Sequence, residues 1–145
     1  PRSTLSSSSA ASAVYKRQPV GCAIALKAIN VILNEGLIEN VGLLTPKFEA
    51  GLAELAKNPN IGEARSKGLM GALEAVKDKD TKTPFGPEAN VSEKIANTCS
   101  DFGLICRPLG QAIVLCPAFI MTDSQMEEMF DKLSKALNKV FAEVS

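Results

Sequence analysis

The chain has 145 residues, sixteen basic and sixteen acidic side chains, and no histidine. Its length gives at most one domain with a sizeable core, and the ordinary apolar content of 46% excludes wholesale disorder. The neutral net charge argues against a nucleic-acid partner, and the lack of an apolar run of ~20 residues argues against a membrane span. The missing histidine removes the commonest zinc ligand, so we expect no metal site.

The first eighteen residues differ in composition from the rest of the chain. Residues 3–13 are mostly serine and alanine, Lys16 and Arg17 add charge, and the apolar segment of a secretory signal is missing. Arginine and serine without acidic residues are faintly like a transit peptide, whereas a flexible leader, a cloning remnant or a misread junction fits the low complexity better. We therefore expect residues 1–18 to be a leader and residues 19–145 to be the folded domain.

Two helices are predicted after this leader. Between Val20 and Glu35 the polar residues fall on one stripe, and a helix so apolar around its circumference is expected to be covered on more than one side. Gly36 is a typical C-terminal stop for this helix. The next helix begins at Leu37 and carries apolar residues at steps of three and four, and Pro46 within it should produce a kink or a break.

The middle of the chain predicts strands followed by a helix. Residues 61–76 have the pattern of strand, turn and strand, with glycines at the bends, and residues 77–84 form a charged loop. Asn90, followed three residues later by Glu93, is typical of a capping box. This pair predicts the start of a helix over residues 91–102.

The last part of the chain predicts two short strands and a closing helix. The strands cover residues 104–107 and 112–116, and the helix follows Thr122 as its N-cap, with Gln125 three residues later. Its apolar residues recur at helical spacing and are expected in the core: Met126, Met129, Phe130, Leu133, Leu137, Val140 and Phe141. The order of elements predicts an α+β (two-layer α/β) fold, a small mixed or antiparallel sheet with helices on one face.

The four cysteines are Cys22, Cys99, Cys106 and Cys116, and none of them forms a C-x-x-C pair. Cys106 and Cys116 fall on the two adjacent strands predicted above, so packing accounts for both. We expect reduced, partly buried thiols in a cytoplasmic protein, rather than disulfides or metal ligands.

One stretch, residues 103–117, indicates chemistry. A helix ends at Gly103, a short apolar strand follows, and Arg107 stands at the end of that strand before Pro-Leu-Gly. A cation at the rim of a small sheet could hold a carboxylate, whereas the other reading is an ordinary surface arginine. Because the sequence shows no nucleophile paired with a base and no metal-ligand spacing, we expect part of an enzyme rather than a whole one.

Four segments, taken in order and with their spacing, carry a family resemblance: residues 19–28, 34–41, 68–74 and 103–117. With them, residues 19–145 resemble the C-terminal portion of a class III aminotransferase, a pyridoxal-phosphate enzyme of fold-type I, and are most like bacterial omega-aminotransferases that use pyruvate. The resemblance implies the small domain with its leading connecting helix. It also implies a homodimeric parent that moves an amino group between an amine or amino acid and a keto acid.

The resemblance further implies which site residues are present. The family's cofactor lysine lies upstream of the matching portion, and no lysine here matches it, so we expect no catalytic residue and no cofactor-binding residue in this chain. Where the family has a threonine that contacts the cofactor phosphate of the partner subunit, this chain has Val14, which has no hydroxyl. Arg107 matches the arginine that binds the substrate's carboxylate and swings aside for uncharged amines.

Two functions stay open at this point. The first is a C-terminal fragment of a pyridoxal-phosphate-dependent omega-aminotransferase, inactive and without bound cofactor as an isolated chain. The second is a stand-alone α/β binding or interaction domain without catalysis. The DNA upstream of the Pro19 codon would separate them, because a reading frame with the cofactor lysine supports the first.

Overall fold

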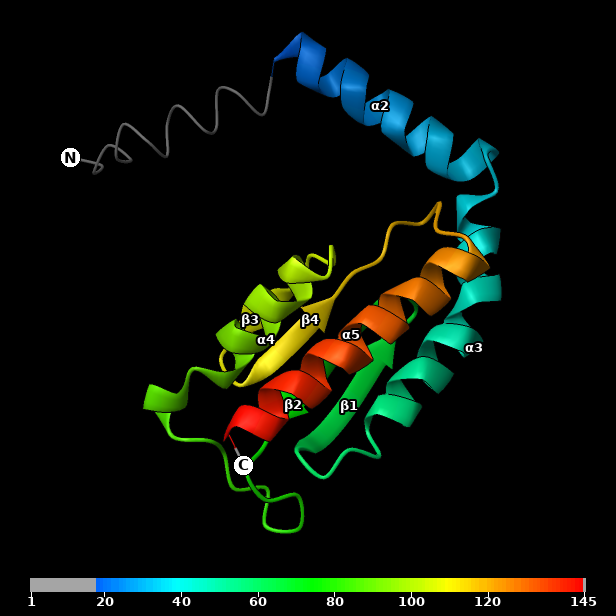
Figure 1. The fold of residues 1–145 in the computed structure, drawn as a ribbon. Helices are drawn as coiled ribbons and strands as arrows, with labels where there is room; N and C mark the ends of the chain where they lie inside the picture. Colours follow the sequence, from blue (N-terminus) through cyan, green and yellow to red (C-terminus); the bar gives the residue numbers. More distant parts are fainter. Residues whose placement is uncertain (1–17, 145) are drawn as a thin grey trace, which may run out of the picture. The chain divides into compact units, whose positions relative to one another are not determined.

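The computed structural model describes residues 18–144, which form two compact units, one reaching to Ile38 and one beginning at Glu39 (Figure 1). The expected leader lies outside the described residues apart from Gln18, and so does Val14. Within the described part, no single helix is long and apolar enough to cross a membrane. The first two helices pass that test of length and composition only as a bent pair.

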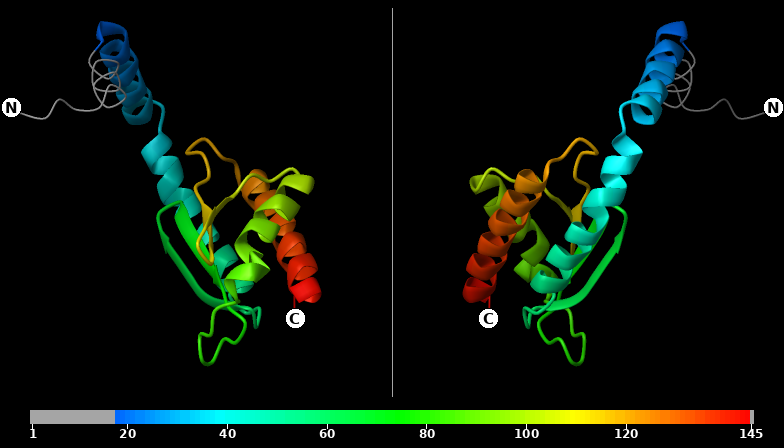
Figure 2. Two further views of the ribbon diagram at one scale, coloured as in Figure 1. Left: turned by 90° about the vertical axis from the view of Figure 1, so that its left-hand side faces the viewer. Right: turned by 90° about the vertical axis from the view of Figure 1, so that its right-hand side faces the viewer.

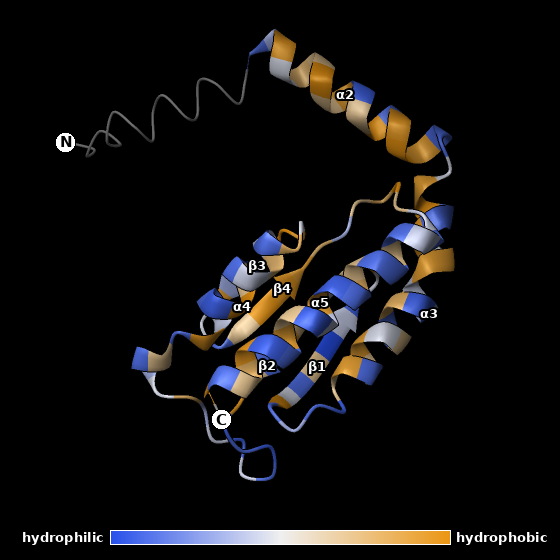
Figure 3. Cartoon of the chain, in the orientation of Figure 1, coloured by the Kyte–Doolittle hydropathy of each residue, from blue (hydrophilic) through white to orange (hydrophobic). Residues whose placement is uncertain are grey.

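Helix α2, Pro19–Asn34, makes up most of the described part of the first unit. Proline stands in its first turn, where a missing N–H costs nothing, and Gly36 past its end adopts a left-handed φ of 68°. No residue of α2 is buried, and Val20 and Leu33 expose 68% and 67% of their surface. Figure 3 shows apolar residues along its whole length. The predicted burial of this helix on several sides is therefore not seen in the described residues.

Helix α3, Leu37–Leu55, continues through Pro46, so of the predicted kink or break, the break is wrong. Apolar residues on both sides of the proline anchor the helix, since Leu44 and Phe48 are both buried in the core. This packing outweighs the one backbone hydrogen bond that proline removes.

Four strands form one antiparallel sheet in the order β1-β2-β4-β3. The strands are β1 Ile61–Lys67, β2 Met70–Ala75, β3 Arg107–Leu109 and β4 Ala112–Leu115. The predicted strand, turn and strand of residues 61–76 is confirmed as β1 and β2, which are joined at Gly68 with a left-handed φ of 57°. The sheet is thus antiparallel rather than mixed.

The predicted strand at residues 104–107 is wrong in its position. Strand β3 begins where that strand should end, at Arg107, and runs through Pro108, so the turn to β4 contains only Gly110 and Gln111. Gly110 has a left-handed φ of 59°, which suits a two-residue hairpin turn. Proline is tolerated because β3 is an edge strand, where one side of the backbone needs no ladder partner.

Helices cover one face of this sheet, as the two side views of Figure 2 show. They are α3, α4 (Val91–Asp101), which follows the short 3₁₀ helix η1 (Pro87–Ala89), and α5 (Asp123–Val144). The core lies between the layers and includes these buried residues: Phe48, Leu52, Leu73, Ile95, Ile113, Leu115, Met126, Leu133, Leu137 and Val140. The predicted α+β class, with helices on one face, is confirmed.

The predicted N-cap of α5 is confirmed, whereas the predicted capping box of α4 is absent. At the start of α5, the Thr122 N–H donates to Oε1 of Gln125 at 2.9 Å, and the Gln125 N–H donates to Oγ1 of Thr122 at 3.3 Å. At the start of α4, Asn90 is left-handed (φ 46°) and its side chain makes no capping bond, so the box with Glu93 is wrong. Instead, the buried Ser92 hydroxyl donates to the Gly110 carbonyl at 2.6 Å, which ties α4 to the β3–β4 turn.

Candidate functional site

The face of the sheet opposite the helices carries two arginines in one cross-strand row. Arg65 of β1 pairs with Ala72 of β2, Ala72 pairs with Val114 of β4, and Val114 pairs with Arg107 of β3. Directly opposite residues in a sheet point to the same face, so all four lie on the open face. Strands are ~4.8 Å apart, so three spacings separate the arginine backbones by about 14 Å.

The two arginines of the described residues differ in their partners. The Arg65 guanidinium donates to the carboxylates of Glu74 at 3.2 Å and Glu63 at 3.3 Å, and these hydrogen bonds raise the pKa of Arg65 above its ordinary value. Arg107 is exposed and forms no ion pair or hydrogen bond through its side chain with any residue between 18 and 144. Its guanidinium is therefore available for an external anion.

The fold fixes the backbone of Arg107 while its side chain stays exposed. Arg107 is the first residue of β3 and pairs with Val114, and the β3–β4 turn is held by the Ser92 hydroxyl on the Gly110 carbonyl. A planar guanidinium presented in this way can bind a carboxylate through two parallel hydrogen bonds. The long side chain can also turn away without disturbing the strand.

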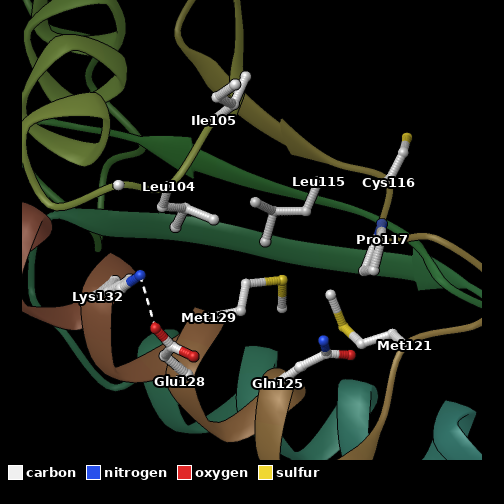
Figure 4. A pocket seen from close by; sticks show the side chains of 11 residues that line it. Leu104, Ile105, Leu115, Cys116, Pro117, Met121, Gln125, Glu128, Met129 and Lys132 are labelled. Carbon is white, nitrogen blue, oxygen red and sulfur yellow. Dashed lines mark ion pairs between the residues drawn. The ribbon is translucent and has the colours of Figure 1, made fainter.

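A hollow of about 390 Å³ lies on the open face, lined by Arg65, Ser66, Lys67, Met70, Gly71, Ala72 and Val114. Val114, which lines this hollow, is also the residue of β4 that pairs with Arg107 of β3. A second pocket, of about 220 Å³, lies between residues 103–105, the end of β4 and α5 (Figure 4). Its charged side chains, Glu128 and Lys132, pair with each other at 2.7 Å, so it offers no free cation to a carboxylate.

The lysines of the described residues do not fit a pyridoxal-phosphate site. None of them is buried, and Lys27, Lys77, Lys79 and Lys82 are exposed as predicted. A lysine that forms a Schiff base needs a lowered pKa, whereas the hydrogen bond that the half-buried Lys47 donates to the Glu127 carboxylate raises the pKa of Lys47. The expectation that the isolated chain binds no cofactor stays a prediction.

The cysteines are arranged differently from the prediction. Cys106 and Cys116 lie just outside β3 and β4, and the pKa of the buried Cys99 thiol of α4 is raised by its interaction with Cys106 together with burial. Cys22 and Cys116 are exposed, so only two of the four thiols are even partly buried. All four are free, and no group of three or more potential metal ligands is present in the part of the chain that the structure describes.

One feature of the open face was missed from the sequence. Arg65 was not singled out, although two-residue alternation in the predicted strand would have placed it on one face with Glu63 and Lys67.

Comparison with known proteins agrees with this geometry. The family Aminotransferase class-III matches residues 3–137. The chain is 34% identical over 131 residues to the putrescine–pyruvate aminotransferase of Pseudomonas aeruginosa, covering 90% of this chain and 28% of that protein. It is also 34% identical over 125 residues to the mitochondrial gamma aminobutyrate transaminase 1 of Solanum lycopersicum, covering 86% of this chain and 24% of that one.

Solved structures show the same similarity in three dimensions. An omega-aminotransferase from Paracoccus denitrificans matches with a TM-score of 0.86 and 71% identity, and the PMP-bound aminotransferase from Vibrio fluvialis matches with 0.86 and 68%. Each match covers 88% of this chain and 28% of the other. The chain thus spans about a quarter of the length of the proteins it matches. By sequence and by fold, it belongs to the class III aminotransferase family.

Proposed function

We propose that this chain is the C-terminal, small-domain part of a pyridoxal-phosphate-dependent omega-aminotransferase. The parent enzyme moves an amino group between an amine or amino acid and a keto acid such as pyruvate. Membership of the class III family and the match to solved omega-aminotransferases support this assignment. When bound in the whole enzyme, the cofactor supplies the electron sink, which no residue of this chain provides.

Within that enzyme, Arg107 binds the carboxylate of the amino-acid or keto-acid substrate. The observation that carries this proposal is the contrast on the open face: Arg65 is held by two glutamates, whereas Arg107 is exposed and unpaired among the described residues, on a fixed strand. A free guanidinium binds a substrate carboxylate without first breaking an internal ion pair.

The isolated chain is expected to be inactive, and the whole enzyme to be a homodimer. Inactivity is expected because the described lysines are exposed or half-buried and none fits the cofactor. The cytoplasmic location stays a prediction, since the names of tomato relatives place those proteins in mitochondria and chloroplasts.

The test uses a full-length class III aminotransferase that carries this segment as its C-terminal part. Arg107→Ala should lower kcat/KM for keto-acid and amino-acid substrates by about 30- to 1000-fold, the equivalent of roughly 2–4 kcal/mol for a charge-assisted bidentate pair. Uncharged amines should be largely spared. The two half-reactions are measured separately, because an overall assay with pyruvate reports the carboxylate step for every donor.

Two further variants define the outcome. Arg107→Lys should recover only part of the loss, since an ammonium keeps the charge but not the planar fork. Arg65→Ala removes an arginine from the same row and should leave the preference between charged and uncharged substrates unchanged. Equal losses for both substrate types in Arg107→Ala would mean that Arg107 supports the fold. An inactive full-length protein, beside an active relative with its own segment, would favour a binding domain without catalysis.

A further inference from the structure

Strand β3, which carries Arg107, has few backbone partners of its own. It is three residues long and lies at an edge, so β4 is its one neighbour among the described strands. Its middle residue is Pro108, which has no N–H to donate to that neighbour. Strand β4, by contrast, pairs with β2 on its other side. The direction in which Arg107 is presented therefore depends on contacts outside the sheet.

Helix α4 supplies such contacts on both sides of Arg107. Before β3, the Leu104 N–H donates to the Cys99 carbonyl at 2.8 Å, which fixes the chain three residues ahead of Arg107. After β3, the Ser92 hydroxyl donates to the Gly110 carbonyl at 2.6 Å, which fixes the chain three residues past Arg107. Arg107 thus lies midway between two points at which the chain is bound to the same helix.

The two contacts differ in the groups that make them. The first joins backbone atoms and closes the end of α4, with Gly103 in a left-handed φ of 75°, so no side-chain substitution removes its donor or acceptor. The second depends on a single hydroxyl. Ser92 is 6% exposed and is the one buried polar side chain among the described residues. Its hydrogen bond is therefore the support of β3 that a substitution can remove.

We propose that Ser92 is a positioning residue for Arg107, and that its hydroxyl sets the preference of the whole enzyme for carboxylate substrates over uncharged amines. This inference rests on the proposed function, because it concerns the same guanidinium. Without the hydrogen bond, the turn at Gly110 can move away from α4. Because proline has a fixed φ, the short strand moves with the turn instead of bending at Pro108. A bidentate pair needs both N–H groups to face the two carboxylate oxygens, so such a movement weakens it.

The experiment uses the full-length aminotransferase described above and measures the two half-reactions separately. Ser92→Ala should raise KM for pyruvate by about 3- to 30-fold and leave kcat nearly unchanged, because the carboxylate contact exists in both the ground state and the transition state. Uncharged amines should react as they do with the unsubstituted enzyme. Gly110 is exposed, so water can hydrogen-bond its carbonyl in the variant, and the fold should be kept.

A double variant tests whether Ser92 acts through Arg107. In the Arg107→Ala enzyme, adding Ser92→Ala should cause no further loss with pyruvate, since the guanidinium that the hydroxyl positions is already absent. A merely structural serine would instead lower the rates with charged and uncharged substrates alike, and its loss would add to that of Arg107→Ala.

Three more variants serve as controls. Ser100→Ala makes the same change on the same helix, at an exposed serine whose side chain forms no hydrogen bond with residues 18–144, and should alter neither substrate type. Ser92→Thr keeps the hydroxyl and should retain most of the preference, because a pocket of about 280 Å³ beside Ser92 has room for the methyl group. Ser92→Cys keeps the size with a weaker donor and should fall between serine and alanine, which keeps the test valid if Ser92→Ala fails to fold.

The outcomes separate this inference from the proposed function. The positioning role is overturned if Arg107→Ala is selective against carboxylate substrates but Ser92→Ala leaves KM for pyruvate unchanged, or slows both substrate types equally. If Arg107→Ala itself shows no selectivity, the proposed function of Arg107 is wrong, and the role of Ser92 falls with it. The two failures are thus seen in different variants.

Discussion

The two faces of the sheet share four strands but differ in what their side chains can tolerate. On the covered face, a Cβ added at Gly71 would lie 2.7 Å from the ring of Phe48, so no space is left between β2 and α3. On the open face, Arg65 is paired with two glutamates, and Arg107 stays free among the described residues. We therefore expect the parity of a position along its strand to decide how strongly a substitution there changes stability.

The largest effect on stability should come from the covered face. Phe48→Ala removes a fully buried ring and should lower the free energy of unfolding of the chain by about 3–5 kcal/mol, through lost burial and a residual cavity. Urea unfolding followed by far-UV circular dichroism measures this change. Arg107→Ala, on the open face, should change the same quantity by less than about 0.5 kcal/mol. Similar losses in the two variants would remove the distinction between the faces.

A smaller effect is expected from filling the space beside Gly71. Gly71→Ala places a methyl group against Phe48 and Leu52, which are both buried and cannot yield, and should cost about 1–3 kcal/mol. Gly42→Ala in α3 is the matched control, since no atom lies within 4 Å of its added Cβ, and the better helix former should stabilise by about 0.5–1 kcal/mol. The Tm of thermal unfolding should fall for Gly71→Ala and rise for Gly42→Ala. A higher Tm for Gly71→Ala would show that the covered face has space for an added methyl group.

The smallest effect on stability is expected at the N-terminal ends of α5 and α4, where the two helices differ in their capping. Thr122→Ala removes a capping bond of α5 and should cost about 1 kcal/mol, whereas Asn90→Gly should change stability by only a few tenths of a kcal/mol. Asn90 makes no capping bond, and glycine adopts its left-handed φ easily. If Asn90→Gly lowered the free energy of unfolding in urea as much as Thr122→Ala does, the Asn90 side chain would have to be capping α4 after all.

Local patterns in the sequence determined most of the helices and the first hairpin. Three kinds of signal involve residues close together in sequence: the apolar spacing of α3 and α5, the glycine at the turn between β1 and β2, and the pair Thr122 and Gln125. Such signals can be recognised without knowledge of the tertiary structure. The segments around Arg107 also carried the family resemblance, which the comparisons confirm. The role of Arg107 in binding substrate was expected from that resemblance and stays a proposal.

Only the tertiary structure decided where β3 begins and what its neighbours touch. Leu104 and Ile105 are as apolar as a strand, yet Ile105 is 92% exposed and Leu104 completes the end of α4, because the hairpin turn at Gly110 sets the pairing with β4. That register places Arg107 on the open face in line with Arg65. The row that holds Arg65 and Arg107 also depends on the pairing of β2 with β4, whose residues are far apart in sequence, and no local pattern encodes that contact.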